Sequence, residues 1–121
     1  MIDHSSTLIY LDTNAYSRPF DDQTRTDIQA EANAFLEIIA EVKSGKLLLL
    51  SSDILHFEVH NVLNVEKRTK IEDHLLLCVE HIENSEDVLN LGKQVQDGCH
   101  LRARDALHIA SAIIGQARYF L

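Results

Sequence analysis

Near its N-terminus the sequence runs Leu8-Ile9-Tyr10-Leu11-Asp12-Thr13-Asn14, four apolar residues followed by three polar ones. A short apolar run with β-favouring residues is typical of a buried strand, and this strand is expected to end at Asp12. Similar runs lie at 47–50, where Ser51-Ser52-Asp53 follows, and at 117–121. A further strand is expected at 81–85. These runs are the candidate strands of a central sheet.

Amphipathic helices are expected between these strands. After a loop at 13–22, the first helix extends from a capping box at Thr26 and Gln29 to the stop signal Ser44-Gly45. Four more helices are predicted from apolar residues that recur every three or four positions. Their stripes are Leu55, Val59, Val62 and Leu63; Ile71, Leu75, Cys78, Val79 and Ile82; Val88, Leu91 and Val95, with Gly98 as the stop; and Ala106, Ile109, Ala110 and Ile113 in the helix 102–114. Strands that alternate with helices predict an α/β fold with a largely parallel sheet.

The composition limits the class of protein. The chain has 121 residues, which fits a single domain over 1–121, and is 45% hydrophobic and 25% charged, which excludes a disordered or collagen-like protein. Four glycines and one proline are too few turn residues for an all-β sandwich. Cys78 and Cys99 lack metal-ligand spacing and are expected to be reduced thiols. No apolar run is long enough for a bilayer, and Met1-Ile2-Asp3-His4 has no basic leader pattern, so a cytoplasmic protein without membrane contact is expected.

The net charge is negative. Nineteen acidic and eleven basic residues give −8, so a phosphate backbone would repel the chain and a passive nucleic-acid coat is excluded. A protein of this charge that acts on phosphates needs an added positive charge, and a divalent cation would supply it. The alternative is that the acidic surface serves solubility alone.

Three acidic residues lie at positions where parallel α/β folds bind their ligands. Asp12 follows the first strand and belongs at the carboxyl edge of the sheet, although it could serve only as a turn residue. Glu58 lies within an apolar helix stripe and therefore needs a cation or a metal as its partner, unless it reaches solvent. Asp105 occupies the first turn of its helix, where an acid also suits the helix dipole. Together the three predict a site for Mg²⁺ or Mn²⁺, which prefer oxygen ligands.

Three stretches carry a resemblance to a known family. They are Leu8 to Asn14, Ser51 to Glu58, and Arg104-Asp105-Ala106-Leu107-His108-Ile109-Ala110-Ser111-Ala112. In order and rough spacing they resemble the motifs of PIN domains, above all those of the compact prokaryotic toxins, the VapC-like ribonucleases of toxin–antitoxin pairs. The resemblance implies a three-layer α/β/α domain with a short, mostly parallel central sheet.

The resemblance also implies a function and a site. It implies a Mg²⁺- or Mn²⁺-dependent endoribonuclease that hydrolyses RNA phosphodiester bonds, with Asp12, Glu58 and Asp105 as catalytic acids and metal ligands and Asn14 in support. An antitoxin protein is the implied partner, and family toxins are commonly homodimers. The fourth acid of the family follows the strand that here ends at Leu121, so the domain is expected to lack its C-terminal end.

Two other functions stay open. One is a degenerate, non-catalytic PIN scaffold that binds RNA or a protein partner, which the missing fourth acid favours. The other is a phosphatase with Asp12 as its nucleophile, although such a fold favours a second Asp where Asn14 stands.

The segment 18–35 is expected to border the mouth of the site and to take part in partner binding. Arg18 is a candidate phosphate contact, and Phe20 could stack on a base or anchor a partner. The alternative is that Phe20 folds onto the core and Arg18 pairs with Asp21 or Asp22. His108 is expected to pack or to form hydrogen bonds rather than to act as a general base, and the side chains at 56 and 60 are expected to point away from Glu58.

Overall fold

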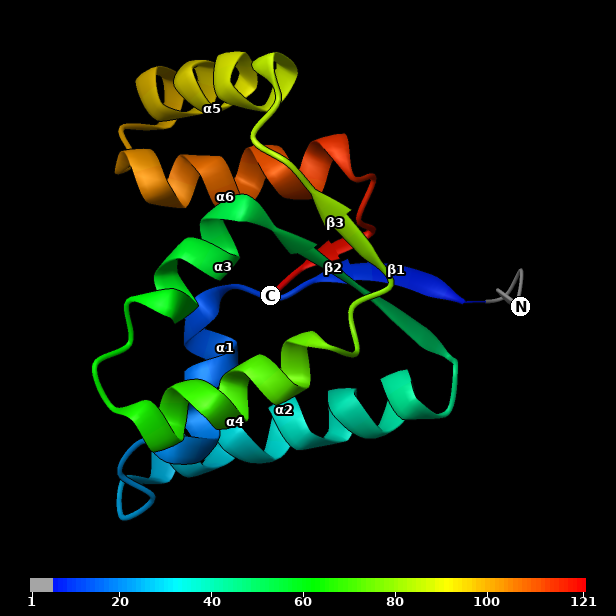
Figure 1. Cartoon of the computed structure of the whole chain (residues 1–121), viewed down its shortest axis with the longest axis vertical. Coiled ribbons are helices and arrows are strands. Elements are labelled where there is room, and N and C mark those ends of the chain that lie inside the picture. The colour runs from blue at the N-terminus through cyan, green and yellow to red at the C-terminus, as the bar shows by residue number, and fades with distance from the viewer. Residues whose placement is uncertain (1–5) are drawn as a thin grey trace.

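A four-stranded sheet in the order β3-β2-β1-β4 lies at the centre of the computed structural model, which describes residues 6–121 (Figure 1). The strands are β1 (Thr7–Tyr10), β2 (Leu47–Ser52), β3 (Glu80–Ile82) and β4 (Tyr119–Phe120). All three pairings are parallel, with Ile9 opposite Leu49 in the central pair. The largely parallel α/β sheet predicted from the sequence is therefore confirmed. The prediction that 1–4 carries no leader falls outside the described residues.

Helices cover both faces of the sheet. They are α1 (Thr13–Ser17), the 3-10 helix η1 (Arg18–Phe20), α2 (Thr26–Lys43), α3 (Asp53–His60), α4 (Val65–Leu75), α5 (Glu86–Cys99) and α6 (Ala103–Ile114). Figure 1 shows α2 and α4 on one side of the sheet and α6 on the other, with α5 outside α6. The expected three-layer α/β/α arrangement is confirmed. No helix within 6–121 is long and apolar enough to cross a membrane.

Alternation along the strands supplies both halves of the core. Successive side chains of a strand point to opposite faces of a sheet. In β1, Ile9 packs with Phe35 of α2, whereas Tyr10 packs with Ala112 of α6. Because both faces are covered, the central strands β1 and β2 contain continuous apolar runs, Leu8–Tyr10 and Leu47–Leu50, instead of an alternating pattern.

The prediction of a loop at 13–22 is wrong, because this segment contains α1 and η1. The Asp12 side chain accepts a hydrogen bond from the Ala15 backbone N–H at 3.2 Å and so caps α1. The capping box predicted at Thr26 is also absent. Arg25 occupies the N-cap position of α2 without a side-chain bond, and the Asp22 side chain instead accepts from the Thr24 backbone N–H and hydroxyl.

Two helix ends differ from the prediction. α3 ends at His60, so Leu63, assigned to its stripe, lies outside the helix and is 95% exposed. α4 begins at Val65, capped by Asn64, and ends at Leu75. Its predicted stripe ran on to Cys78, Val79 and Ile82. The backbone leaves the helix because the Val79 N–H donates to the Leu49 carbonyl at 2.9 Å and joins the sheet, and Ile82 belongs to β3.

Candidate active site

Two helices begin at the same edge of the sheet, where the parallel strands β1 and β2 end. Asp12 caps α1 after β1, and Ser52 caps α3 after β2 by accepting a hydrogen bond from the Leu55 backbone N–H at 3.1 Å. Asp12 is half-buried, and its own N–H donates to the Leu121 carbonyl at 3.1 Å. The predicted position of Asp12 at the carboxyl edge is therefore correct, and the residue also performs the turn role that was the alternative.

Glu58 of α3 is the best-connected acid of the site. Its Oε1 accepts hydrogen bonds from the Thr13 hydroxyl at 2.6 Å and from His108 Nε2, and its Oε2 lies 3.7 Å from a guanidinium nitrogen of Arg104. Thr13 comes from α1, and the other two come from α6. The sequence required a partner for a carboxylate in an apolar stripe, and Arg104 supplies the cation.

The surroundings of Glu58 keep it ionised. Burial raises its pKa, but the hydrogen bonds from Thr13 and His108 and the positive charge of Arg104 lower it, and the result is a pKa below the ordinary value of a glutamate. Glu58 is therefore a fixed negative charge at neutral pH.

Asp105 lies in the first turn of α6 and is exposed. Among the described residues its side chain forms no hydrogen bond or ion pair, although the preceding residue, Arg104, and His108, three residues further on, both contact Glu58. The structure thus brings the start of α6 to Glu58 and leaves the Asp105 carboxylate free of protein partners within 6–121.

The three acids do not form a ready metal site. Within 6–121, no three His, Cys, Asp or Glu side chains are grouped so that they could hold a metal ion. Carboxylate oxygens have the right chemistry for Mg²⁺ or Mn²⁺, but Asp12 Oδ1 and Glu58 Oε1 already accept hydrogen bonds from the protein. The convergence of Asp12, Glu58 and Asp105 on a cation stays a prediction.

Arg18 and Asn14 line a pocket beside Asp12. The pocket has a volume of about 330 Å³, and its lining comes from the ends of β1 and β4 and from α1, η1 and α2: Leu11, Asp12, Asn14, Ala15, Arg18, Glu31, Ala34, Phe35, Ile38 and Leu121. Arg18 pairs with Glu31 and, at 3.1 Å, with Asp21. The alternative in which Arg18 pairs with a neighbouring aspartate is therefore the one observed.

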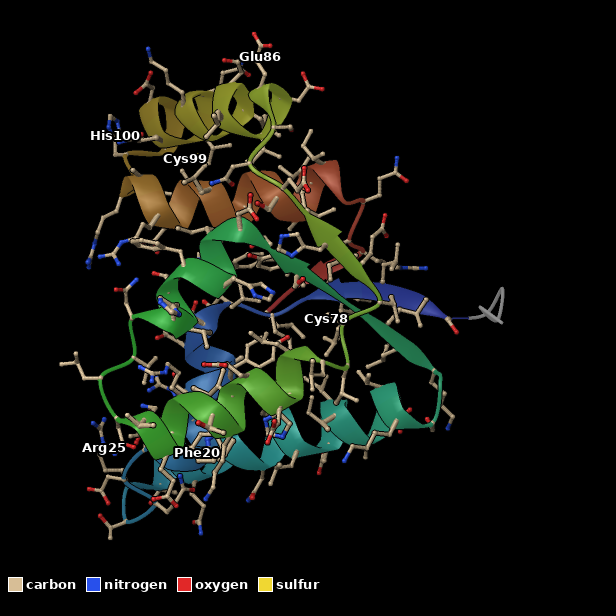
Figure 2. All side chains as sticks on the ribbon, viewed as in Figure 1. Phe20, Arg25, Cys78, Glu86, Cys99 and His100 are labelled. Atoms are coloured by element: carbon tan, nitrogen blue, oxygen red, sulfur yellow. The ribbon has the colours of Figure 1, made fainter. Side chains whose placement is uncertain are left out.

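Phe20 folds back toward the core. It packs against the apolar cluster that α1, α2 and α4 share, and the Lys70 ammonium lies 5.8 Å from its ring centroid. Figure 2 shows Phe20 at the end of the molecule where α2 and α4 meet. The structure therefore favours the packing role over a base-stacking role for this side chain.

Sequence reasoning did not assign the contacts that Tyr10, Thr13 and Ser52 make around Glu58 and His108. The Tyr10 hydroxyl lies 2.6 Å from Ser52 Oγ and 2.6 Å from His108 Nδ1, and all three residues are buried. A tyrosine at the end of a fully buried strand was the available signal, because a buried phenol needs a hydrogen-bond partner. The expectation that His108 forms hydrogen bonds is confirmed. His56 and His60 line a separate pocket between α3 and α4, away from Glu58, as expected.

Comparison with known proteins finds a likeness of fold. No protein-family model matches the chain, and no curated protein does. Among solved structures, a chain in the crystal structure of VapBC2 from Rickettsia felis bound to a DNA fragment from their promoter matches with a TM-score of 0.64 and 15% identity, over 93% of this chain and 86% of that one. At this identity the match shows a shared fold, which agrees with the predicted three-layer α/β/α class.

Proposed function

We propose that this chain is a Mg²⁺- or Mn²⁺-dependent endoribonuclease and the toxin of a toxin–antitoxin pair. The observation that carries the proposal is the placement of Glu58. Its carboxylate lies at the sheet edge between Thr13, which follows Asp12, and the first turn of α6, which bears Asp105. The likeness to a VapBC2 chain supports the same function.

Each residue has a role under this proposal. Asp12, Glu58 and Asp105 would hold the cation, and Asn14 would support Asp12. A divalent cation bound there supplies charge neutralisation for a phosphodiester and lowers the pKa of water. Because the chain carries a net charge of −8, it depends on such a cation to accept RNA.

Cleavage of RNA by the purified chain tests the proposal. We expect Mn²⁺-dependent cleavage that stops with a chelator and is lost in Glu58→Gln. The matched control is Glu41→Gln, which removes the same charge from an exposed position near the end of α2. Cleavage that persists in Glu58→Gln, or that ignores the chelator, would contradict the proposal.

A degenerate scaffold is the second candidate. It is favoured by the neutralisation of Glu58 by Arg104 and by the absence of a three-ligand group within 6–121. Titration with Mn²⁺ separates the two, since a nuclease binds the ion saturably and a degenerate scaffold binds RNA or a protein without it.

A further inference from the structure

We propose that Ser52, Tyr10 and His108 form a one-way hydrogen-bond chain that fixes the Glu58 carboxylate, which makes Tyr10 and His108 positioning residues of the candidate site. The role of Glu58 in this inference rests on the proposed function, whereas the direction of the chain does not.

The chain is continuous and buried. Ser52 Oγ lies 2.6 Å from the Tyr10 hydroxyl, which lies 2.6 Å from His108 Nδ1, and His108 Nε2 contacts Glu58 Oε1. Tyr10 and Ser52 are fully buried and His108 is 4% exposed. The four residues come from β1, the end of β2, α3 and α6, so the chain joins the sheet to two helices.

Donor and acceptor counting fixes the direction. An ionised carboxylate only accepts, so His108 Nε2–H donates to Glu58. In a neutral imidazole Nδ1 then accepts, and Tyr10 O–H must donate to it. The Tyr10 oxygen accepts from the Ser52 hydroxyl, whose oxygen accepts from the Leu55 N–H at 3.1 Å. In this arrangement every group of the chain has a partner.

The other neutral tautomer of His108 fits less well. A ring protonated only at Nδ1 would aim the Nε2 lone pair at a carboxylate.

The ring of Tyr10 is held in place for this task. It stacks on Phe120 with the centroids 5.5 Å apart and meets the His108 ring edge-on at 5.7 Å. Burial raises the pKa of Tyr10 well above its ordinary value, so the hydroxyl keeps its proton. Tyr10 therefore remains a donor, and His108 remains oriented toward Glu58.

Nitrogen-15 NMR of the histidine rings in the metal-free chain tests the inference directly. In the neutral ring we expect His108 to carry its proton at Nε2 and to leave Nδ1 unprotonated. In Tyr10→Phe, the Nδ1 resonance should shift because its donor is gone. The matched control is Tyr16→Phe, which also removes a fully buried hydroxyl, one that contacts only Cys78 Sγ at 3.7 Å.

The NMR results test the inference without any measurement of nuclease activity. A neutral His108 ring that carries its proton at Nδ1 in the unaltered chain would overturn the inference even if Tyr10→Phe does not fold. So would a His108 spectrum that Tyr10→Phe and Tyr16→Phe leave equally unchanged. Because these spectra need neither metal nor RNA, they decide the inference even if the chain proves not to be a nuclease.

The positioning role has a second readout. If Glu58 binds the cation, loss of a supporting hydrogen bond should raise the Mn²⁺ dissociation constant about tenfold in Tyr10→Phe and leave it unchanged in Tyr16→Phe. Equal Mn²⁺ affinities in the two variants would contradict a positioning role for Tyr10.

Discussion

Glu58 collects contacts from two elements distant in sequence, and this makes its charge sensitive to acid. Its pKa is held below the ordinary value in the folded chain and returns to about 4.5 on unfolding. A lowered pKa stabilises the fold above the unfolded value, and this stabilisation is lost as the pH falls through the folded value.

We therefore expect the free energy of unfolding to decrease as the pH is lowered below about 4.5. The decrease should be less steep in Glu58→Gln. Urea unfolding of both proteins at a series of pH values measures the difference. The same acid sensitivity in both would mean that the Thr13 and His108 contacts do not hold the carboxylate in solution.

Asp105 offers the opposite case, a charge without a protein partner within 6–121. Asp105→Asn should cost the metal-free fold no more than the favourable dipole interaction of an acid in the first helical turn, about 0.3–1 kcal/mol. It should nevertheless reduce the stabilisation by Mn²⁺. Thermal melts with and without Mn²⁺ measure both effects. A loss of several kcal/mol without metal would instead make Asp105 a structural residue.

Single residues differ in how far the sequence could place them. The edge position of Asp12 and the need of Glu58 for a partner followed from strand ends and from the helix stripe. The link from Tyr10 to His108 could not be found in this way, because it joins positions 98 apart through the packing of α6 on the sheet. Likewise, nothing in the local pattern assigned Thr13 to Glu58, since α1 was expected to be a loop.

At the scale of elements, the sequence predicted the strands and the long helices and misplaced the short connections. α1 is only five residues long, too short for apolar spacing to show, and the Asp-Thr-Asn chemistry that favours a turn also caps a helix. The stripe of α4 was extended too far because Cys78 and Val79 continue its spacing by chance. Backbone pairing with β2 outweighs that spacing, and no local pattern carries this information.

The end of α5 carries a strained residue. His100 follows the helix with φ of 55°, in the left-handed region that favours glycine, and Figure 2 shows it at the opposite end of α5 from Glu86. We expect His100→Gly to stabilise the fold by about 0.5 kcal/mol, because relief of the left-handed strain exceeds the entropy that glycine adds to the unfolded chain.

Chemical denaturation measures this change. Gln94→Gly, inside the same helix and exposed, is the matched control and should destabilise by about 0.5 kcal/mol. A loss of stability in both variants would show that the His100 side chain contributes more than its backbone conformation costs.

The molecule as a whole carries an excess of negative charge, −8 on 121 residues. Self-repulsion opposes the compact state, and salt screens it. We expect the melting temperature to be higher at the physiological ionic strength of about 0.15 M than at low salt. Mn²⁺ at matched ionic strength should raise it further if the candidate site binds the ion. Equal melting temperatures with Mn²⁺ and with NaCl at the same ionic strength would mean that Mn²⁺ acts only by screening charge.

The outer position of α5 gives this helix a lower local stability than the central sheet. It packs principally on α6, where Gly92 lies so close to Leu107 that a Cβ at position 92 would come within 3.1 Å of that side chain. Helix α6 lies between α5 and the sheet (Figure 1). A helix supported mainly by one neighbour can detach while the remainder stays folded. We therefore expect the amides of α5 to exchange with deuterium through local opening and those of β1 and β2 only through global unfolding. The contacts around Glu58 should then persist when the outer helix detaches.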